Sequence, residues 1–286
     1  MPTTVVESIS ELRSRLQSQR KTGLVPTMGA LHAGHARLIE TARNECDPVV
    51  VSIFVNPLQF DRKDDLDRYP RTLDSDVELC RKLSVDLIFA PSADEMYPAP
   101  PACMVDVGRI ADHLCGPFRP GHFGAVATVV MKLLQIVQPK RAYFGEKDAQ
   151  QLAVIRRVVA DLNVPTAIVE VPTVREADGL AMSSRNRLLS ESQRGSAIVL
   201  YEALSEASGL IAAGQRDAAV IRRTATTRIG AAPGVRLEYF DTVDPEEMQP
   251  VSRVDGPVRV AGAIWVGSTR LIDNMLCVPP ICPAVS

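Results

Sequence analysis

The stretch from Pro26 to His35, with the sequence PTMGALHAGH, constrains the fold of this chain more than any other. It follows a short apolar run at 23–25 and precedes a segment in which Leu38, Ile39 and Ala42 have helical spacing. This order predicts a strand, a tight glycine-containing turn and the start of a helix. A strand joined to a helix by so short a turn is typical of an α/β fold.

The predicted helix start is also a candidate anion site. A helix N-terminus presents unpaired backbone N–H groups and a partial positive charge. His32 and His35 are three residues apart, so both imidazoles would lie on one face of the first turn and could donate to phosphate oxygens. The alternative is that these histidines are surface residues or helix caps. The chain has only 4 histidines, and finding two of them here favours a chemical role.

Further apolar runs and helical patterns alternate along the first part of the chain. Strands are predicted at 23–28, 48–55, 85–90, 141–144 and 167–171, and helices at 8–18, 34–46, 73–83, 121–137 and 147–162. Residues 91–120 are rich in proline and are predicted as loops, with one short extended piece at 104–107. Strands alternating with helices at this spacing predict an α/β fold with a doubly wound parallel sheet.

The pattern changes after Val174. Two alanine-rich helices are predicted at 191–213 and 217–230, and extended segments follow at 235–243, 258–266 and 270–277. These elements indicate a smaller α+β unit. We therefore expect two domains, residues 1–173 and residues 174–286, with the boundary near 172–175.

The charge balance argues against nucleic-acid and membrane partners. The net charge is −2, so no strong field would attract a nucleic-acid backbone or an anionic membrane. Residues 1–20 do not resemble a signal peptide, and no apolar run approaches the roughly 18 residues of a membrane span. The 6 cysteines are scattered without a C-x-x-C pair, which predicts reduced thiols, a cytoplasmic location and no zinc site.

A second constellation lies between Tyr143 and Gln151, where a predicted strand leads through Gly145 into a helix start that carries Lys147 and Asp148. Backbone at the glycine and the lysine ammonium could approach the same phosphate. The alternative is a solvated lysine beside an aspartate that only complements the helix dipole. Neither G-x-x-x-x-G-K-[ST] nor G-x-G-x-x-G occurs, so this is not a Walker loop.

A third constellation is the hydroxyl-rich basic loop at 181–187, which follows a turn signal at 178–179. On composition alone it is a simple Ser/Asn loop that leads into the next helix. The functional interpretation is a mobile phosphate clamp, in which Ser183 and Ser184 donate hydroxyls and Arg185 supplies a fixed positive fork.

Three other polar residues lie near predicted strand ends or helix starts. Gln59 and Gln151 are neutral amides that could hold a hydroxyl or a carboxylate without adding charge, although each alone is also a plausible surface amide. His122, within the sequence RPGHFG, is predicted to be structural or to cap the helix that it begins.

Several segments together resemble the pantothenate synthetase family, the pantoate–β-alanine ligases. In order, they are PTMGALHAGH, SIFVNPLQF, YPRT, RPGHF, FGEKD with QQL, VPTVREADGLAMSSRN and LIDN. The resemblance is most specific over residues 20–190 and rests on 271–274 in the C-terminal part. It implies a Rossmann-like sheet shared with class I aminoacyl-tRNA synthetases, and an H-x-G-H nucleotidyltransferase signature at residues 32–35.

The resemblance implies a two-step reaction in which ATP and (R)-pantoate give pantoyl adenylate and pyrophosphate, and the amine of β-alanine then displaces AMP. It implies catalytic roles for His32, His35, Lys147, Ser183, Ser184 and Arg185, and pantoate contacts for Gln59 and Gln151. ATP contacts are implied for Met28, Gly29, Ala30, Leu31, His32, Ala33, Gly34, His35, Gly145, Glu146, Lys147, Asp148, Val174, Met182, Ser183, Ser184 and Arg185. It also implies a homodimer and Mg²⁺ on the ATP phosphates, without a protein cage for the metal.

Three positions depart from the family pattern. Ala33 stands where a glutamate is common, and its side chain is expected to face away from the site. Ser75 stands where an acidic residue is common, which weakens the case for a metal-related role of that segment. Ala149 replaces a common aromatic residue, and we expect looser packing near the nucleotide.

Two rival functions remain open at this point. One is an adenylyl- or cytidylyltransferase that shares H-x-G-H but makes a nucleotide product, and Gln59 and Gln151 weigh against it. The other is a non-catalytic nucleotide-binding protein on the same scaffold. A non-catalytic protein would not need to retain all of the candidate catalytic groups, and this chain has both histidines, Lys147 and the Ser-Ser-Arg loop.

Overall fold

The computed structural model describes residues 3–19, 21–60 and 63–280. The chain divides into two compact units, and each contains separate stretches of sequence. Unit 1 holds the chain up to Val107 together with Arg119–Glu146 and Val154–Val174. Unit 2 holds Gly108–Phe118, Lys147–Ala153 and the chain from Arg175 onward. The division into functional domains 1–173 and 174–286 stays a prediction.

Unit 1 is built on a parallel sheet. Its strands are β1 (Thr4–Val6), β2 (Gly23–Thr27), β3 (Val49–Ile53), β4 (Leu87–Phe89), β5 (Arg141–Gly145) and β6 (Ala167–Val171). They lie in the order β1-β4-β3-β2-β5-β6, and each adjacent pair is parallel. Near-continuous apolar strands such as β3 suit a sheet that is covered on both faces.

Helices cover both faces of this sheet. The helices of unit 1 are α1 (Ile9–Leu16), α2 (Ala33–Glu45), α3 (Lys63–Arg68), α4 (Leu73–Lys82), α5 (Ala93–Met96), α6 (His122–Val137) and the end of α7 (Ala149–Asp161), and those that cover the sheet include α2, α4 and α6. Ile39 of α2 and Cys80 of α4 share a buried core with Val25 and Val51 of the sheet. Strand alternation points Val50 to the opposite face, where it is also fully buried. Helix α6 contacts β2 and α1, so the predicted doubly wound fold is confirmed.

Four details of residues 3–174 differ from the sequence predictions. Strand β1 was not predicted, because three residues are too few to show a period of two. The predicted loop at 91–120 contains α5 and the 3₁₀ turns η2 (Gly108–Ala111) and η3 (Gly116–Phe118), while 104–107 forms no strand. Gly145 ends β5 and does not form a separate turn. Helix α7 begins after the 3₁₀ turn η4 (Glu146–Asp148).

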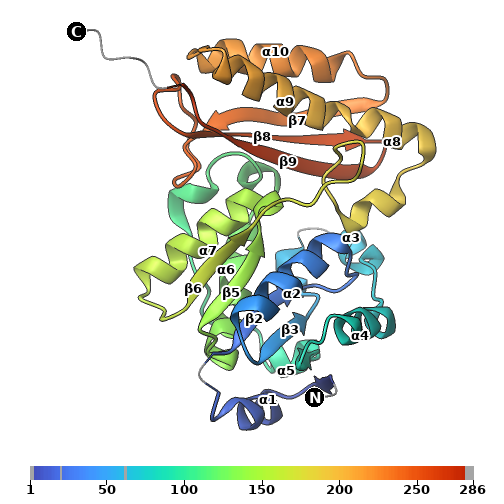
Figure 1. Cartoon of the computed structure of the whole chain (residues 1–286), viewed down its shortest axis with the longest axis vertical. Helices are drawn as coiled ribbons and strands as arrows, with labels where there is room; N and C mark the ends of the chain where they lie inside the picture. The colour runs from blue at the N-terminus through green and yellow to red at the C-terminus, as the bar shows by residue number, and fades with distance from the viewer. Residues whose placement is uncertain (1–2, 20, 61–62, 281–286) are drawn as a thin grey trace. The chain divides into compact units, whose positions relative to one another are not determined.

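Unit 2 carries an antiparallel sheet of β7 (Val235–Val243), β8 (Val258–Val266) and β9 (Thr269–Cys277), in that order. Helices α9 (Val199–Ala212) and α10 (Ala218–Gly230) lie together over this sheet (Figure 1). Their apolar faces bury Leu204, Ile211 and Ile221 against Phe240 and Ile264. The predicted helix at 191–213 is divided into α8 (Glu191–Ala197) and α9.

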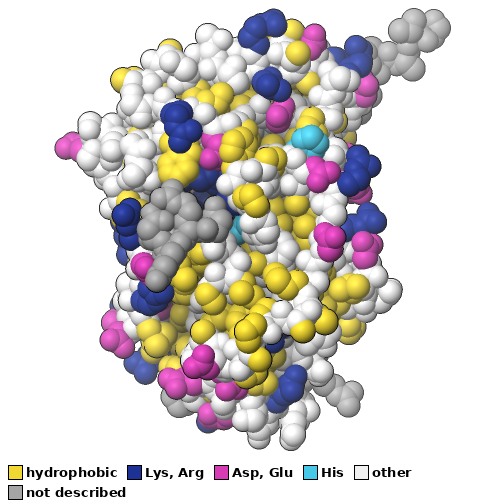
Figure 2. All heavy atoms as spheres, turned by 180° about the vertical axis from the view of Figure 1, so that it is seen from behind, with side chains coloured by type: hydrophobic (Ala, Val, Ile, Leu, Met, Phe, Trp, Pro, Cys, Tyr) yellow, Lys and Arg dark blue, Asp and Glu magenta, His cyan; other side chains and the backbone are white. Residues whose placement is uncertain are grey.

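The surface carries charges of both signs. On the face drawn in Figure 2, Lys and Arg side chains are interspersed with Asp and Glu. No helix within residues 3–19, 21–60 and 63–280 is long and apolar enough to cross a membrane. The free cysteines of the described chain are Cys46, Cys80, Cys103, Cys115 and Cys277, and Cys282 lies outside the described residues.

Candidate active site

The order of the strands in unit 1 creates a switch point beside β2. The chain proceeds from β2 through β3 to β4 on one side, whereas β5 and β6 extend the sheet on the other side. Open α/β sheets bind ligands at the carboxyl ends of the strands at such a point. The turn at 28–35 follows β2, the loop with Gln59 follows β3, and Glu146 follows β5. The sheet topology therefore supports a ligand site at this edge.

The two histidines of the turn form a capping box at the start of helix α2, in which each side chain accepts a backbone N–H group. His32 is the N-cap residue, and its Nδ1 accepts a hydrogen bond from the Gly34 N–H at 3.1 Å. The Nδ1 atom of His35 accepts the His32 N–H at 3.2 Å, and the two ring centroids are 4.1 Å apart. Because both Nδ1 atoms act as acceptors, the proton of each neutral ring lies on Nε2. The caps thus leave each imidazole with Nε2–H as its donor.

A buried carboxylate organises the turn before this helix. Gly29 and Ala30 have left-handed backbones, with φ of 82° and 51°. The N–H groups of Ala30 and Leu31 donate to Asp76 Oδ2 at 2.9 Å and Oδ1 at 2.8 Å. Thr72 Oγ1 donates to the same carboxylate at 3.2 Å, and Asp76 is only 2% exposed. These bonds stabilise a conformation that non-glycine residues such as alanine rarely adopt.

The sequence predicts unpaired backbone N–H groups at the start of this helix, and for part of the turn that prediction is wrong. The N–H groups already bound inside the protein include those of Gly29, Ala30, Leu31, His32 and Gly34. The physical reason is that a buried N–H group without a partner is unfavourable, so the fold supplies acceptors of its own. Side chains, above all the two imidazoles, become the more prominent candidates for phosphate contacts.

Asp76 was not predicted as a site residue. It lies 45 residues beyond Leu31 in the sequence, and an aspartate in the first turn of α4 suits the helix dipole in any case. The neighbouring Ser75 is exposed, and its hydroxyl donates to the Thr72 carbonyl at 2.9 Å. In the sequence, Ser75 departs from the family pattern, whereas Asp76 carries no comparable signal.

Replacing Asp76 by Asn should destabilise unit 1. The amide keeps the shape of the carboxylate, but its NH₂ group would face a backbone N–H and leave that donor without an acceptor. We expect the free energy of unfolding to fall by about 1–3 kcal/mol, measured by urea denaturation. The exposed Asp74→Asn variant on the same helix turn is the matched control. Equal stability of the two variants would show that Asp76 does not hold the turn.

Gln59 lies in the 3₁₀ turn η1 (Pro57–Gln59) and is 7% exposed. A chain of hydrogen bonds orients its amide: Tyr97 Oη donates to Asn56 Oδ1 at 3.1 Å, and Asn56 Nδ2 donates to Gln59 Oε1 at 3.3 Å. The Gln59 Nε2 atom lies 2.8 Å from Met28 Sδ. Burial raises the pKa of Tyr97 to about 12, so its hydroxyl stays a donor at neutral pH.

The backbone of Gln59 is held by one residue just before helix α6 and by the first residue of that helix. Arg119 Nη2 donates to the Gln59 carbonyl at 3.2 Å, and His122 Nδ1 lies 2.9 Å from the same oxygen. His122 is 8% exposed, and the N-cap of α6 is Gly121. His122 therefore has a structural role, as predicted, because it holds the Gln59 loop. It does not cap its own helix.

Three predicted site residues of unit 2 line one small cavity. Lys147, Ser183 and Arg185 surround a space of about 10 Å³, enough for about one water molecule. The Lys147 side chain is 18% exposed, and its Nζ lies 3.7 Å from Asp148 Oδ2. Gln151 stands half-buried in the first turn of α7.

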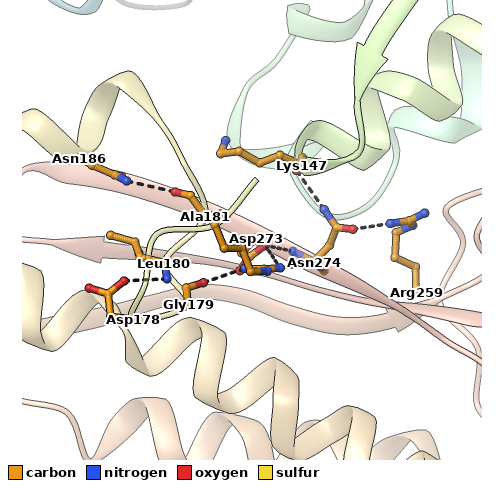
Figure 3. Close-up of polar contacts among 10 residues, drawn as sticks. Lys147, Asp178, Gly179, Leu180, Ala181, Asn186, Arg259, Asp273 and Asn274 are labelled. Carbon is orange, nitrogen blue, oxygen red and sulfur yellow. Dashed lines mark hydrogen bonds and ion pairs between the residues drawn. The ribbon is translucent and has the colours of Figure 1, made fainter. Parts of the chain in front are cut away.

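The loop that carries Ser183 and Arg185 is ordered by local contacts. It ends in the 3₁₀ helix η5 (Ser184–Leu188), and Ser183 Oγ caps this helix by accepting the Arg185 N–H at 3.3 Å. Asn186 Nδ2 donates to the Ala181 carbonyl at 3.1 Å, as Figure 3 shows, and to Glu176 Oε1 at 2.7 Å. These contacts tie the end of the loop to its beginning.

The remaining predicted positions are placed as follows. Ala33 is exposed on the first turn of α2, and the expectation that its side chain faces away from the site stays a prediction. Ala149 is buried at the start of α7. Val174 is the last residue of unit 1, and both it and Met182 are half-buried. The predicted contact residues thus fall into two groups, one in each unit.

Comparisons with known proteins match this geometry to one family. The model of the family described as pantoate-beta-alanine ligase matches residues 4–276. The chain belongs to the pantoate–β-alanine ligase family. It is 50% identical to a pantothenate synthetase from Moorella thermoacetica over 276 residues, which cover 95% of this chain and 98% of that protein.

Solved structures agree with this membership. The chain resembles the crystal structure of pantothenate synthetase from Thermus thermophilus with a TM-score of 0.92 and 47% identity, covering 98% of this chain and 100% of that one. It also resembles a pantoate-beta-alanine ligase from Francisella tularensis, complexed with "Beta-gamma ATP and Beta-alanine". That TM-score is 0.79 with 36% identity, covering 96% of this chain and 97% of that one. The family model also covers residues 271–274. The family resemblance predicted from the sequence motifs is therefore confirmed, including its C-terminal part.

Proposed function

We infer that this chain catalyses the ATP-dependent condensation of (R)-pantoate with β-alanine to give pantothenate, AMP and pyrophosphate. The single observation that carries this function is the family match over residues 4–276. The reaction proceeds through pantoyl adenylate, and the amine of β-alanine then displaces AMP. The product places the enzyme in pantothenate and coenzyme A biosynthesis.

The first step brings a carboxylate toward an anionic α-phosphate, so Coulomb repulsion opposes it. The site must therefore supply positive charge and alignment. We propose that His32 and His35 donate to phosphate oxygens through Nε2, with stabilisation of phosphate charge as the main role of His35 and proton donation as a secondary one. The capped Nδ1 atoms support this assignment. Lys147 and Arg185 would supply charge from unit 2, and their shared cavity supports a common role.

The wider set of ATP contacts is proposed on the same basis. The ammonium of Lys147 and the hydroxyls of Ser183 and Ser184 would contact phosphate, while neighbouring backbone and side chains bind the rest of the nucleotide. These neighbours are Met28, Gly29, Ala30, Leu31, Ala33, Gly34, Gly145, Glu146, Asp148, Val174 and Met182.

The glutamines are proposed to select pantoate. A neutral amide can bind the hydroxyl and carboxylate oxygens of pantoate without attracting every anion. The buried, oriented amide of Gln59 supports this role, because a fixed donor discriminates between substrates better than a mobile one. Gln151 is proposed as the second pantoate contact, and the β-alanine site is expected beside Gln59.

Mg²⁺ is proposed to enter with ATP and to be held by phosphate oxygens and water. Within the described residues, no three His, Cys, Asp or Glu side chains gather as a metal site. The Asp76 carboxylate is already occupied by backbone N–H groups, and Ser75 offers no charge. Asp76 and Ser75 therefore offer no protein cage for the metal.

The second step exposes an acyl adenylate that water can hydrolyse. We propose that residues 174–286 act as a lid domain and that the Ser183–Arg185 loop closes over the intermediate, whereas residues 1–173 bind ATP and pantoate. The small volume of the cavity beside Lys147 supports a loop that must rearrange around a triphosphate.

Ser184→Ala should weaken adenylate formation more than the transfer of preformed adenylate to β-alanine. The lost hydroxyl is proposed to contact phosphate only while pyrophosphate is leaving. We expect roughly a tenfold loss in the first half-reaction and a smaller loss in the second. Ser10→Ala, an exposed substitution in α1, serves as the control. Equal losses in both half-reactions would reject this role.

We propose that the enzyme is a cytoplasmic homodimer that associates through its N-terminal domain. Family resemblance and free thiols support this proposal, as does the gathering of hydrophobic side chains over part of the lower half of the face in Figure 2. Sedimentation equilibrium should give twice the 31.1 kDa mass of one chain. A single species at the monomer mass would contradict the dimer.

Pantoate-dependent exchange of pyrophosphate into ATP tests the proposed function. We expect exchange that requires pantoate and does not require β-alanine, followed by pantothenate formation once β-alanine is added. A nucleotidyltransferase that makes a nucleotide product would not depend on pantoate. A non-catalytic binding protein would give no exchange with any acid, and either outcome would reject the proposal.

A further inference from the structure

The sequence Leu271-Ile272-Asp273-Asn274 lies on β9 and carries part of the family resemblance, but none of its residues is among the proposed substrate contacts. Asp273 and Asn274 are each only 5% exposed. Polar side chains are rarely buried this deeply without partners. Consecutive residues on a strand point to opposite faces, so these two can serve different partners. Figure 3 shows the contacts that they make.

Asn274 holds the backbone of the Lys147 turn. Its Nδ2 donates to the Lys147 carbonyl at 2.9 Å, and its Oδ1 accepts from the Arg259 guanidinium of β8. An arginine can only donate, so Oδ1 must face Arg259 and Nδ2 must face the carbonyl. The orientation of the amide is therefore fixed. Through it, the central strand of the β7-β8-β9 sheet locates the backbone that carries the Lys147 ammonium.

Asp273 holds the beginning of the Ser-Ser-Arg loop. Its carboxylate makes a bidentate ion pair with Arg175, with distances of 2.6 Å and 3.0 Å. The same guanidinium donates to the Gly179 carbonyl at 3.0 Å and lies 4.8 Å from the centre of the Tyr201 ring. The Asp273 side chain is 4% exposed, and paired forks of this kind fix orientation as well as charge.

The two contacts are linked at the strand itself. The Asn274 N–H donates to Asp273 Oδ1 at 2.8 Å, so the carboxylate that holds Arg175 is fixed relative to the amide that holds Lys147. Lys147 and Arg185 also line the same cavity as Asp273. Displacing β9 would therefore move both sources of positive charge.

We propose that Asp273 and Asn274 are positioning residues that set the Lys147 turn and the Ser183–Arg185 loop in register for adenylate formation. This inference rests on the proposed function. Neither side chain is required to touch substrate. Each acts through the backbone or side chain that it holds, and a displacement near 1 Å can cost roughly 100-fold in rate.

Asn274→Asp tests the contact with Lys147 almost without changing shape. The aspartate still accepts from Arg259, but it places an oxygen against the Lys147 carbonyl where the amide donated. We expect a loss of roughly 10- to 100-fold in kcat for pantoate-dependent pyrophosphate exchange. Transfer of preformed pantoyl adenylate to β-alanine should stay within about twofold.

Asp273→Asn tests the loop. We expect faster hydrogen exchange in peptides that cover 176–186, and more AMP released per pantothenate formed, because a displaced loop admits water to the adenylate. Without the carboxylate, the half-buried charge of Arg175 loses its ion-pair partner, and this loss would destabilise the variant. The charge-free pair Arg175→Met with Asp273→Leu removes that risk and should show the same uncoupling.

Glu206→Gln is the matched control for both variants. It removes an ion pair with Arg228 in the same unit, and this pair contacts neither Lys147 nor the loop. We expect unchanged kinetics and unchanged exchange at 145–151 and 176–186.

The positioning role is rejected if Asn274→Asp slows both half-reactions equally, or if the Asp273 variants keep wild-type exchange at 176–186 and a one-to-one ratio of AMP to pantothenate. Failure of the proposed function would be seen differently, as a wild-type protein that makes no pantothenate. Local hydrogen exchange at 145–151 and 176–186 would still decide whether Asn274 and Asp273 hold these segments.

Discussion

Lys147→Ala should abolish pantoate-dependent pyrophosphate exchange while leaving the fold intact. The ammonium is proposed to stabilise charge that develops on the phosphates, and removal of such a group costs about 10²–10³ in kcat, or about 2.7–4 kcal/mol. The side chain is largely buried beside a cavity, so solvent would screen this interaction weakly. Its backbone contact with Asn274 does not depend on the side chain and should persist in the variant.

Lys82→Ala is the control for the loss of a lysine. Lys82 pairs with Glu78 on the exposed face of α4, and its replacement should change neither exchange nor the melting temperature. If Lys147→Ala kept normal pyrophosphate release with pantoate and ATP, the assignment of Lys147 to the phosphates would be refuted.

His35→Ala should produce the second large loss, again about 100-fold or more in adenylate formation. This substitution removes two functions at once. It deletes the Nε2–H donor proposed for the phosphates, and it deletes the Nδ1 acceptor of the His32 N–H. Loss of a helix cap costs about 0.5–2 kcal/mol of stability, so both activity and the free energy of unfolding should fall.

His35→Gln separates these two functions. A glutamine at the third position of a helix can reach back to the N-cap N–H, which is the contact that His35 makes here. We expect the variant to recover most of the stability lost in His35→Ala and none of the exchange activity. Recovery of activity together with stability would mean that His35 acts only as a cap. Urea denaturation and pyrophosphate exchange on the same preparations provide both measurements.

Local patterns in the sequence were enough to predict most of the fold. The apolar run at Val49–Ile53 and the spacing of Leu38, Ile39 and Ala42 are signals within single elements, and strand–helix alternation then determines the sheet type. β1 was not predicted because three residues are too few to show a period of two, and its pairing with the distant β4 leaves no local signal. The candidate site residues were predicted from motifs that lie at the ends of strands and the starts of helices.

Contacts between distant segments could not be predicted in this way. Asp76 binds a turn 45 residues away, and Asn274 binds the carbonyl of a residue 127 positions away. Both residues also have near neighbours in the sequence, Thr72 for Asp76 and Asp273 for Asn274, but these local contacts do not indicate the distant segment that each one binds. The histidine caps were anticipated only as an alternative to chemistry, whereas Nδ1 and Nε2 allow one imidazole to serve both purposes.

The turn after β2 already binds an anionic group that belongs to the protein, the carboxylate of Asp76 on α4. Because Asp76 accepts from two N–H groups of the turn, it holds this backbone in its folded conformation without help from a bound nucleotide. The conformational entropy of the turn is lost during folding, and ATP binding need not supply it again. Affinity for ATP can therefore be tuned through the side chains around the turn, while the shape of the turn is inherited from the folded protein.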